Sequence, residues 1–423
     1  MTQLPTATRA AAPWTCPFCP LLCDHLGVQA DGAALALVGG RCARASDGLA
    51  QASAGGDATP RVDGRPATLD AAVAAAAHRL GAARQPLFGG LATDVAGARA
   101  LYRLACATGA ITDHAQGDAL MHGLRVQQDR GGYTTTFAEV RARADLVVFL
   151  GGPPLGLAPL LYERLGFGDT GAVPQRRIVV IGAGPDDADA LRQLAALPGC
   201  GVETVALQGD LFASTALLSA LVEQRHVVDA PAAYVALAAA LRAARYAVLV
   251  GAPARLPAHG ALVVETAVRI VNSLNLGTRA AALWIGGGHG AATANQTVTW
   301  LSGLPLRSRA GPRGLEHGPV RFGSARLLDE DAVDALLWVA SIDDTTPPPQ
   351  TTLPLVLLGH PMLAAHADRP GSVFVPVAVP GIDGPGHLFR SDGVVLMPLF
   401  AARPAAQPTV AEVVARITEA LGS

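Results

Sequence analysis

Short apolar runs that end in glycine or proline recur along this chain of 423 residues, and helical stretches separate most of them. The predicted strand cores lie within residues 85–94, 144–152, 176–185, 246–254, 281–289, 334–342, 353–361 and 372–380. Such runs are typical of strands that are buried on both faces of a parallel sheet, and parallel strands need crossover connections, which helices provide. The sequence therefore predicts an α/β fold with two doubly wound parallel-sheet units.

The charge balance and the hydropathy pattern exclude several classes of protein. The net charge of −2 provides no basic surface for nucleic acid or for an anionic membrane. No stretch reaches about 18 uninterrupted apolar residues, so a membrane span is not expected. The start, MTQLPTATRAAAPWT, lacks the basic and then apolar order of a secretory signal. We therefore expect a cytoplasmic protein whose low charged fraction of 16% leaves apolar surface for partner subunits.

Four of the six cysteines fall within the first 42 residues. Cys16, Cys19, Cys23 and Cys42 form the pattern C-x2-C-x3-C-x18-C. A tight run of three cysteines with one distant cysteine is a common way to hold an iron–sulfur cluster, whereas structural zinc sites more often use two separated C-x2-C pairs. The pattern predicts a [4Fe–4S] cluster on these four residues. A zinc ion, or a remnant that binds no metal, are the alternatives.

From these cysteines onward the chain resembles a known family. CPFCPLLCDHLGV, residues 16–28, is similar to the N-terminal cluster motif of the B subunit of formylmethanofuran dehydrogenase, which belongs to the molybdopterin oxidoreductases. The likeness continues at Asp113, at the His122–Gly123 pair and along residues 136–154, and it returns in GIDGPGHLFRSDGVVL, residues 381–396. The matched segments span most of the chain, and the N-terminal motif is the most specific of them.

One departure from this family concerns its metal ligand. In the catalytic members a cysteine stands directly before the His-Gly pair and ligates tungsten or molybdenum, and in this chain that place is taken by Met121. A thioether has no ionisable proton and is a weak donor to a high-valent metal. The resemblance thus implies that Met121 fills vacated space, that the tungsten- or molybdenum-pterin site is lost, and that no molybdopterin or tungstopterin is bound.

A second departure lies at residues 151–165, GGPPLGLAPLLYERL. The family has an Asn-Pro turn here, followed by a stretch rich in histidine and arginine that meets the pterin. A phosphate-rich dinucleotide needs arginines, backbone N–H groups or helix N-termini, and prolines delete N–H donors. The replacement of these donors by proline, leucine and alanine points to the same loss.

The resemblance also implies how the chain is divided. Residues 1–62 form a small region with the four cysteines, and residues 63–154 form the first part of one α/β unit. Residues 155–324 form a second α/β unit that is inserted into the first. Residues 325–423 return to the first unit and end in a helical tail.

Family members without the metal cysteine resemble the B subunit of a bacterial formyltransferase/hydrolase complex. That complex moves a formyl group from a tetrahydromethanopterin carrier to a methanofuran-type carrier and releases formate. The resemblance implies three partners, an amidohydrolase-like A subunit, a scaffold C subunit and a formyltransferase D subunit, and it implies a structural role and no catalytic residue for this chain. The alternatives are a working catalytic subunit of a formylmethanofuran dehydrogenase and a free-standing iron–sulfur electron-transfer protein.

Two glycine-rich turns and one arginine-rich segment lie outside the matched motifs. The turns at residues 181–187 and 285–296 follow predicted strands, and we interpret them as ordinary β-to-α turns because a glycine-rich turn alone is weak evidence for a nucleotide. Residues 304–318 fit a leftover anion-binding loop or a subunit contact, of which we prefer the contact. The segment carries Arg307, Arg309, Arg313, Glu316 and His317.

The remaining candidate residues favour structural roles. Cys106 and Cys200 lie alone in apolar stretches and are predicted to be buried thiols. Asp24 and His25 are interpreted as supports of the cysteine region. Three histidines that follow strands are predicted to be satisfied turn residues: His289, His360 and His387.

Overall fold

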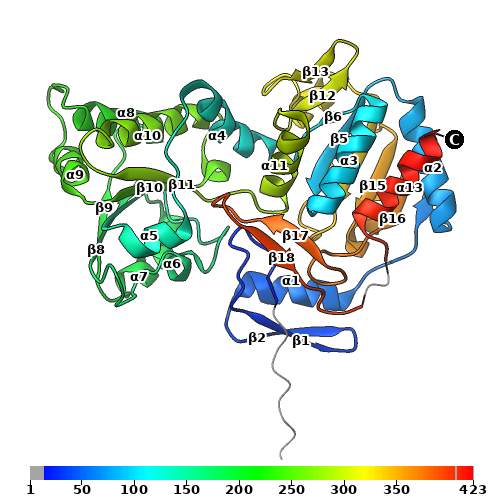
Figure 1. The fold of residues 1–423 in the computed structure, drawn as a ribbon, viewed down its shortest axis with the longest axis horizontal. Coiled ribbons are helices and arrows are strands. Elements are labelled where there is room, and N and C mark those ends of the chain that lie inside the picture. Colours follow the sequence, from blue (N-terminus) through cyan, green and yellow to red (C-terminus); the bar gives the residue numbers. More distant parts are fainter. Residues whose placement is uncertain (1–13, 405–406, 423) are drawn as a thin grey trace, which may run out of the picture.

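The computed structural model describes residues 14–404 and 407–422, and it contains two large β-sheets that lie side by side with helices packed on them (Figure 1). The predicted α/β class is confirmed. Residues 1–13, which carry most of the start that lacks a secretory pattern, lie outside the described residues. In the described part of the chain, no helix has the length and apolar character that crossing a membrane requires.

Five strands form a wholly parallel sheet. Helices α5, α6 and α7 pack on one face and helices α8, α9 and α10 on the other, so the inner strands are buried on both sides, as their apolar sequences predicted. In sheet order the strands are β11 (Ala280–Trp284), β10 (Ala247–Gly251), β7 (Leu146–Leu150), β8 (Arg176–Ile181) and β9 (Cys200–Val205). The helices are α5 (Phe137–Arg143), α6 (Leu161–Arg164), α7 (Ala188–Ala195), α8 (Leu211–Val222), α9 (Ala232–Ala243) and α10 (Gly260–Leu274), with short 3-10 turns η1 (Pro185–Asp187) and η2 (Pro253–Arg255).

The second sheet has nine strands, parallel in its centre and antiparallel at its edges. In order they are β13 (Gly314–His317), β12 (Ser308–Gly311), β6 (Ile111–Thr112), β5 (Pro86–Ala92), β14 (Ala335–Ala340), β15 (Leu355–Gly359), β16 (Ser372–Pro376), β3 (Arg61–Val62) and β4 (Arg65–Pro66). One face is covered by α2 (Leu69–Ala82), α3 (Val95–Thr108), α11 (Ala291–Ser302) and α13 (Val410–Gly422), and the other by α12 (Ser324–Asp329) and the 3-10 turn η3 (Pro361–Ala367).

The order of the strands along the chain shows how the two sheets are interleaved. Strands β5 and β6 precede the five-stranded sheet in sequence, and β14, β15 and β16 follow it. Three strands differ from the predicted division. Strand β7 was predicted to belong to residues 63–154 of the first unit, but it pairs with β8 and β10, and the hairpin β12–β13, predicted within the inserted residues 155–324, joins β6 of the large sheet. An apolar run indicates that a strand is buried, but it does not specify its neighbours.

Two hairpins and two helices complete the structure around the sheets (Figure 1). The N-terminal hairpin consists of β1 (Gly27–Asp31) and β2 (Ala34–Val38), and α1 (Ala43–Ala54) follows it. A second hairpin, β17 (Gly386–Phe389) and β18 (Leu396–Leu399), shares a hydrophobic core with the cysteine segment and the five-stranded sheet. Helix α4 (Gly117–Arg130) packs on α10. The cysteine segment is therefore held by groups from distant parts of the chain.

Candidate functional site: a four-cysteine cavity and an uncharged pocket

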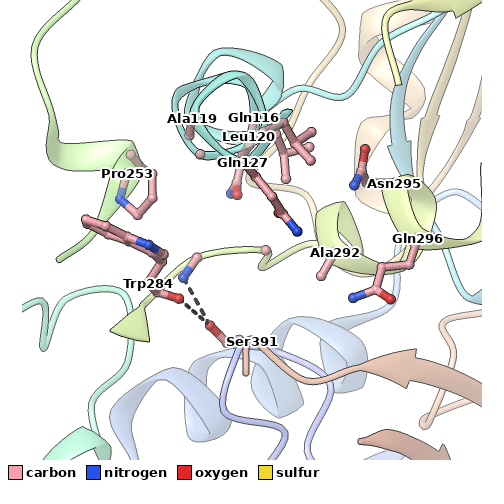
Figure 2. A pocket seen from close by; sticks show the side chains of 15 residues that line it. Gln116, Ala119, Leu120, Gln127, Pro253, Trp284, Ala292, Asn295, Gln296 and Ser391 are labelled. Carbon is pink, nitrogen blue, oxygen red and sulfur yellow. Dashed lines mark hydrogen bonds between the residues drawn. The ribbon is translucent and has the colours of Figure 1, made fainter. Parts of the chain in front are cut away.

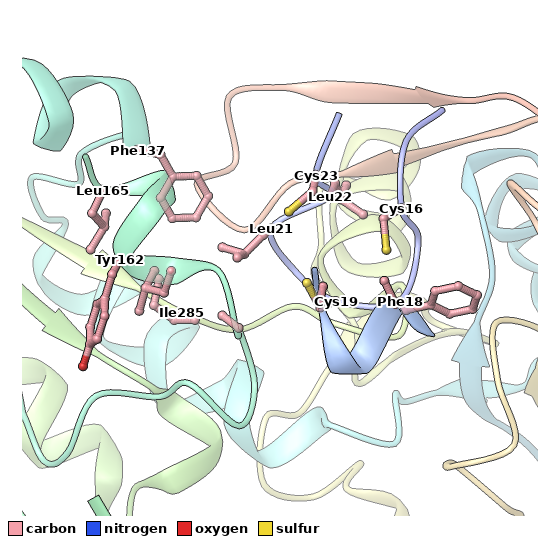
Figure 3. Packing of buried hydrophobic residues seen from close by; sticks show 14 of the residues in the cluster. Cys16, Phe18, Cys19, Leu21, Leu22, Cys23, Phe137, Tyr162, Leu165 and Ile285 are labelled. Atoms are coloured by element: carbon pink, nitrogen blue, oxygen red, sulfur yellow. The ribbon is translucent and has the colours of Figure 1, made fainter. Parts of the chain in front are cut away.

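The four predicted ligands come together in one place. Cys16, Cys19 and Cys23 lie on a loop before β1, which is closed by a hydrogen bond from the Cys16 N–H to the Cys23 carbonyl (2.9 Å), and Cys42 lies at the N-terminus of α1. All four side chains are buried and line a single small cavity. Figure 3 shows the sulfur atoms of the three loop cysteines turned toward the same interior space, with apolar side chains packed around the loop.

The protonation of these thiols follows from their surroundings. Burial raises the pKa of Cys16 and of Cys42. A hydrogen bond between Cys23 and Cys19 lowers the pKa of Cys19 to about 7, and the same bond, together with burial, raises the pKa of Cys23. Four thiolates in an apolar wall would repel each other and lack solvation. A positively charged metal centre supplies the compensation that this arrangement needs, so the donor set fits the predicted cluster.

Within residues 14–404 and 407–422, no group of three or more His, Cys, Asp or Glu side chains is placed to hold a metal ion as the side chains stand. The choice between an iron–sulfur cluster and a zinc ion therefore stays a prediction from the cysteine spacing.

One arginine links the cysteine cavity to a neighbouring surface pocket. Arg44 donates through Nε to the carbonyl of Phe18, in the cysteine loop, and through Nη2 to His289 Nε2 at 3.1 Å. The proton of His289 is thereby assigned to Nδ1, which lies 3.0 Å from Asp343 Oδ2. Burial alone would raise the pKa of Asp343, but the neighbouring His289 and the hydrogen bonds from Thr345 outweigh it, so this pKa lies below its usual range. Arg44, His289 and Asp343 thus lie next to one another along the wall of this pocket, with the histidine between the cation and the carboxylate.

A second histidine connects the two sheets. His114 follows β6, and its Nδ1 accepts the N–H of Gln116 at 2.9 Å, so its proton lies on Nε2, which is 3.1 Å from the His289 carbonyl oxygen. The imidazole is 1% exposed, and burial lowers the pKa of His114 to about 3. His114 is therefore neutral in the folded protein at neutral pH.

A pH dependence of stability follows from this histidine. The unfolded chain protonates His114 near its ordinary pKa of about 6.5, whereas the folded chain does so only near 3. Protons therefore favour the unfolded chain between these values, and we expect His114 to cost about 1.4 kcal/mol of unfolding free energy per pH unit as the pH falls from 6.5. Urea unfolding of the wild type and of His114→Gln between pH 7.5 and 5 measures this, and equal pH slopes for the two proteins would contradict it.

Met121, which the resemblance places at the position of the family's metal ligand, lies on α4. Met121 is 3% exposed and packs inward. A pocket of about 220 Å³ opens beside this helix, and its wall is formed by other residues of α4, by α11 and by the turn after β11 (Figure 2). Met121 is not part of that wall. His122 is half-buried, and burial lowers its pKa. The thioether therefore occupies packing space, as the resemblance implied, and does not point into the cleft.

The loops at the carboxyl ends of β7 and β8 are locked to each other. Asp187 is buried, and its Oδ2 accepts the N–H of Gly184 (2.9 Å) in the glycine-rich turn, while its Oδ1 accepts Nη2 of Arg255 (3.0 Å). Arg255 also donates to the carbonyls of Gly152 and Pro153. In parallel sheets this edge is where phosphates bind. Here the Asp187 carboxylate accepts the hydrogen bonds of the Gly184 N–H and of Arg255, so these donors stabilise the turn.

Two arginines of the segment 304–318, Arg307 and Arg309, form ion pairs with other residues of this chain. Arg307 is 5% exposed and pairs with buried Asp113 (3.1 Å) and with Asp118 (2.6 Å), and Asp113 also accepts two hydrogen bonds from Ser324. Arg309 pairs with Glu316 across the hairpin β12–β13. The predicted subunit contact is therefore wrong for Arg307, because a buried ion pair occupies its guanidinium.

The prediction of buried thiols is wrong: Cys106 is exposed and Cys200 is half-buried, since each apolar stretch presents one side to solvent. Asp24 docks the cysteine loop on α6 through an ion pair with Arg164 (2.7 Å), and the imidazole of His25 contacts Glu163 (3.0 Å), in agreement with the predicted support. His360 is buried and accepts the N–H of Met362, whereas His387 lies exposed on β17 and not in a turn.

Sequence reasoning missed the residues that connect these sites. Arg44 stands two positions after the predicted ligand Cys42. This closeness in sequence was the signal that could have identified it as part of the site. The pairing of Asp187 with Arg255 joins residues 68 positions apart and left no signal in a single sequence.

Comparison with known proteins gives the family. No protein-family model matches the chain. The B subunit of the formyltransferase/hydrolase complex Fhc of Methylorubrum extorquens is 32% identical over 367 residues, which cover 85% of this chain and 97% of that protein. The B subunit of the tungsten-containing formylmethanofuran dehydrogenase 2 of Methanocaldococcus jannaschii is 24% identical over 410 residues, which cover 90% of this chain and 91% of that protein.

A solved structure agrees with the sequence comparison. A chain of the formyltransferase/hydrolase complex FhcABCD from Methylorubrum extorquens, crystallised in complex with methylofuran, superposes with a TM-score of 0.73 at 30% identity, covering 86% of this chain and 98% of that chain. Similarity over this length, together with the matched fold, shows that this chain belongs to the family of B subunits of formyltransferase/hydrolase complexes.

Proposed function

We propose that this chain is the B subunit of a formyltransferase/hydrolase complex of one-carbon metabolism, in which formyl is transferred to a methanofuran-type carrier and released as formate. Its partners are an amidohydrolase-like A subunit, a scaffold C subunit and a formyltransferase D subunit, and the complex works in the cytoplasm. The membership of the family and the near-complete coverage of its relative support this assignment. The chain itself contributes structure and no redox chemistry of its own.

The burial of the Met121 side chain is the main observation in support of a structural role. This side chain is buried in the packing of α4, away from the adjacent pocket, at the position where the catalytic relatives use a cysteine thiolate. No Arg, Lys, His, Asp or Glu is among the described residues that line that pocket. A pterin dinucleotide carries a pyrophosphate that needs cationic or N–H donors. Both features support a subunit that binds no tungsten- or molybdenum-pterin.

The test is a purification under anaerobic conditions with the other three subunits of the same genome, using a tag on this chain. We expect a stable complex that contains the A, C and D subunits and transfers formyl groups, with no tungsten, molybdenum or pterin above background. Failure of the chain to form a stable complex would refute the assignment as a subunit. About one tungsten or molybdenum per chain, with pterin, would refute the structural role and favour the catalytic alternative.

A restored thiol gives a second test of the structural role. In Met121→Cys we expect no tungsten- or molybdenum-dependent oxidation, because the pocket beside α4 would still lack charged groups for a pterin dinucleotide. The measurement is formyl oxidation with an artificial electron acceptor, together with metal analysis of the variant. Metal incorporation with measurable oxidation in this single variant would contradict the argument from the pocket.

We further propose that the four cysteines hold a [4Fe–4S] cluster with a structural role. A cluster ties the loop of Cys16, Cys19 and Cys23 to Cys42 on α1, and its positive irons compensate the buried thiolates. We expect Cys16→Ser and Cys42→Ser each to abolish the visible iron-linked absorption of the anaerobically purified protein and to increase proteolysis of the N-terminal region. Cys106→Ser, which changes an exposed cysteine outside the cavity, is the matched control. Absence of the absorption in the wild type would refute the cluster.

A further inference from the structure

The pocket beside α4 is a formed cavity whose walls come from five parts of the chain (Figure 2). Its volume is about 220 Å³. Helices α4 and α11 supply two walls, and Pro253, Trp284 and the loop residue Ser391 supply the others. Ser391 is used to build the site, since its hydroxyl donates to the Trp284 carbonyl (3.1 Å) and accepts the N–H of Gly286 (3.2 Å).

The polar groups of this pocket are neutral amides. Its lining residues include four carboxamide side chains: Gln116, Gln127, Asn295 and Gln296. The Asn295 oxygen accepts the N–H of Leu306 at 3.1 Å. The three glutamine side chains make no hydrogen bond with any other residue that the structure describes, and Figure 2 shows Gln127 extending from α4 toward the pocket. Each carboxamide offers two N–H donors and one acceptor, so the pocket offers both kinds of partner close together.

The apolar walls add a preference of shape. The Trp284 indole and the Pro253 ring lie on one side, and the side chains of Leu120 and Leu124 come from α4. Aromatic rings and flat apolar walls favour planar ligands, and an uncharged lining favours uncharged ones because nothing compensates a buried ionic group.

We propose that this pocket binds a small, uncharged, planar molecule that carries a carboxamide or lactam group. The ring lies against Trp284, and the amide exchanges hydrogen bonds with the glutamine side chains. This inference stands on the pocket alone and does not depend on the assembly of the chain into a complex.

Two isosteric probes test the charge and the hydrogen-bonding pattern together. Nicotinamide carries a planar ring and a carboxamide, and nicotinate has the same shape with a carboxylate. We expect nicotinamide to bind the full chain saturably and nicotinate to bind at least about tenfold more weakly. Both affinities are measured by NMR saturation transfer and chemical-shift titration. Equal binding of the two probes, or no binding of nicotinamide, would overturn the proposal.

A pair of neighbouring glutamines places the site. Gln127 lines the pocket, whereas Gln128 is exposed on the same helix and does not. We expect Gln127→Leu to weaken nicotinamide binding by about three- to tenfold, which corresponds to one lost hydrogen bond, and Gln128→Leu to leave it unchanged. Both positions are exposed, so neither change threatens the fold. Equal affinities of Gln127→Leu and the wild type would overturn the assignment of the amide contact.

Discussion

Replacement of Arg307 by methionine is expected to lower the free energy of unfolding by about 3–5 kcal/mol. The Asp113 carboxylate is 1% exposed, and Arg307 is the cation that pairs with it, at 3.1 Å. Arg307 also donates to Asp118 and to the Pro319 carbonyl. The substitution keeps the volume of the side chain but leaves the buried Asp113 carboxyl group without its partner. Equilibrium unfolding in urea, followed by tryptophan fluorescence, measures the loss.

The neighbouring Arg309 provides a matched control for Arg307. It lies on the hairpin that follows Arg307 and pairs with Glu316, but its side chain is partly exposed. We expect Arg309→Met to cost no more than about 1 kcal/mol, as is usual for ion pairs near the surface. A loss below about 1 kcal/mol in Arg307→Met would show that the buried pair contributes no more than a surface pair. The double variant Asp113→Leu with Arg307→Met is expected to recover part of the loss, because no charge remains buried.

A single methyl group at Gly152 is expected to disrupt the lock between β7 and β8. A Cβ at Gly152 would lie 1.9 Å from the Asp187 carboxylate, far inside contact distance. The carboxylate would have to leave Gly184 and Arg255, its two partners. We expect Gly152→Ala to lower the free energy of unfolding by about 3 kcal/mol or more, combining steric strain with a broken buried network. Urea unfolding and limited proteolysis of residues 151–165 measure the effect.

Two further variants separate the clash from other causes. Gly156 lies in the same loop, and no atom outside its own chain neighbours lies within 4 Å of the place that a Cβ would take there. We therefore expect Gly156 to accept alanine with a change of about 0.5 kcal/mol or less. Combining Gly152→Ala with Asp187→Gly removes the clashing group, so the double variant is expected to be more stable than the sum of the single changes. Simple additivity would show that the methyl group acts through something other than Asp187.

The sequence predicted which segments are strands better than it predicted which strands pair with one another. The apolar runs at β5, β7, β8, β10 and β14 are strands, as their period and length indicated. Yet β7 has the same character as β5, and only the paired registers of the structure separate them into two sheets. Pairing is decided by packing between distant segments, which a single sequence does not display.

The candidate site shows the same limit at the level of single residues. The four cysteines were identified from their spacing, and the structure brings them to one cavity, although the metal stays a prediction. The burial of Cys106 was predicted wrongly, because an apolar stretch on α3 still has an outward face. Arg307 was predicted at the surface because arginine is common at interfaces, and its buried partner Asp113 is nearly 200 positions away. Long-range ion pairs of this kind need the fold to be known.

The interleaving of the two sheets dictates the order in which this protein is completed during synthesis. Strand β5 emerges from the ribosome early, but its neighbour β14 is made some 240 residues later, after every strand of the five-stranded sheet. The five-stranded sheet is continuous in sequence and has all its partners before then. The nascent chain thus carries the apolar faces of α2 and α3 without their sheet for most of its translation, a stage at which such surfaces aggregate. A chaperone that shields the first hundred residues should therefore raise the yield of this protein more than one that acts on the finished chain.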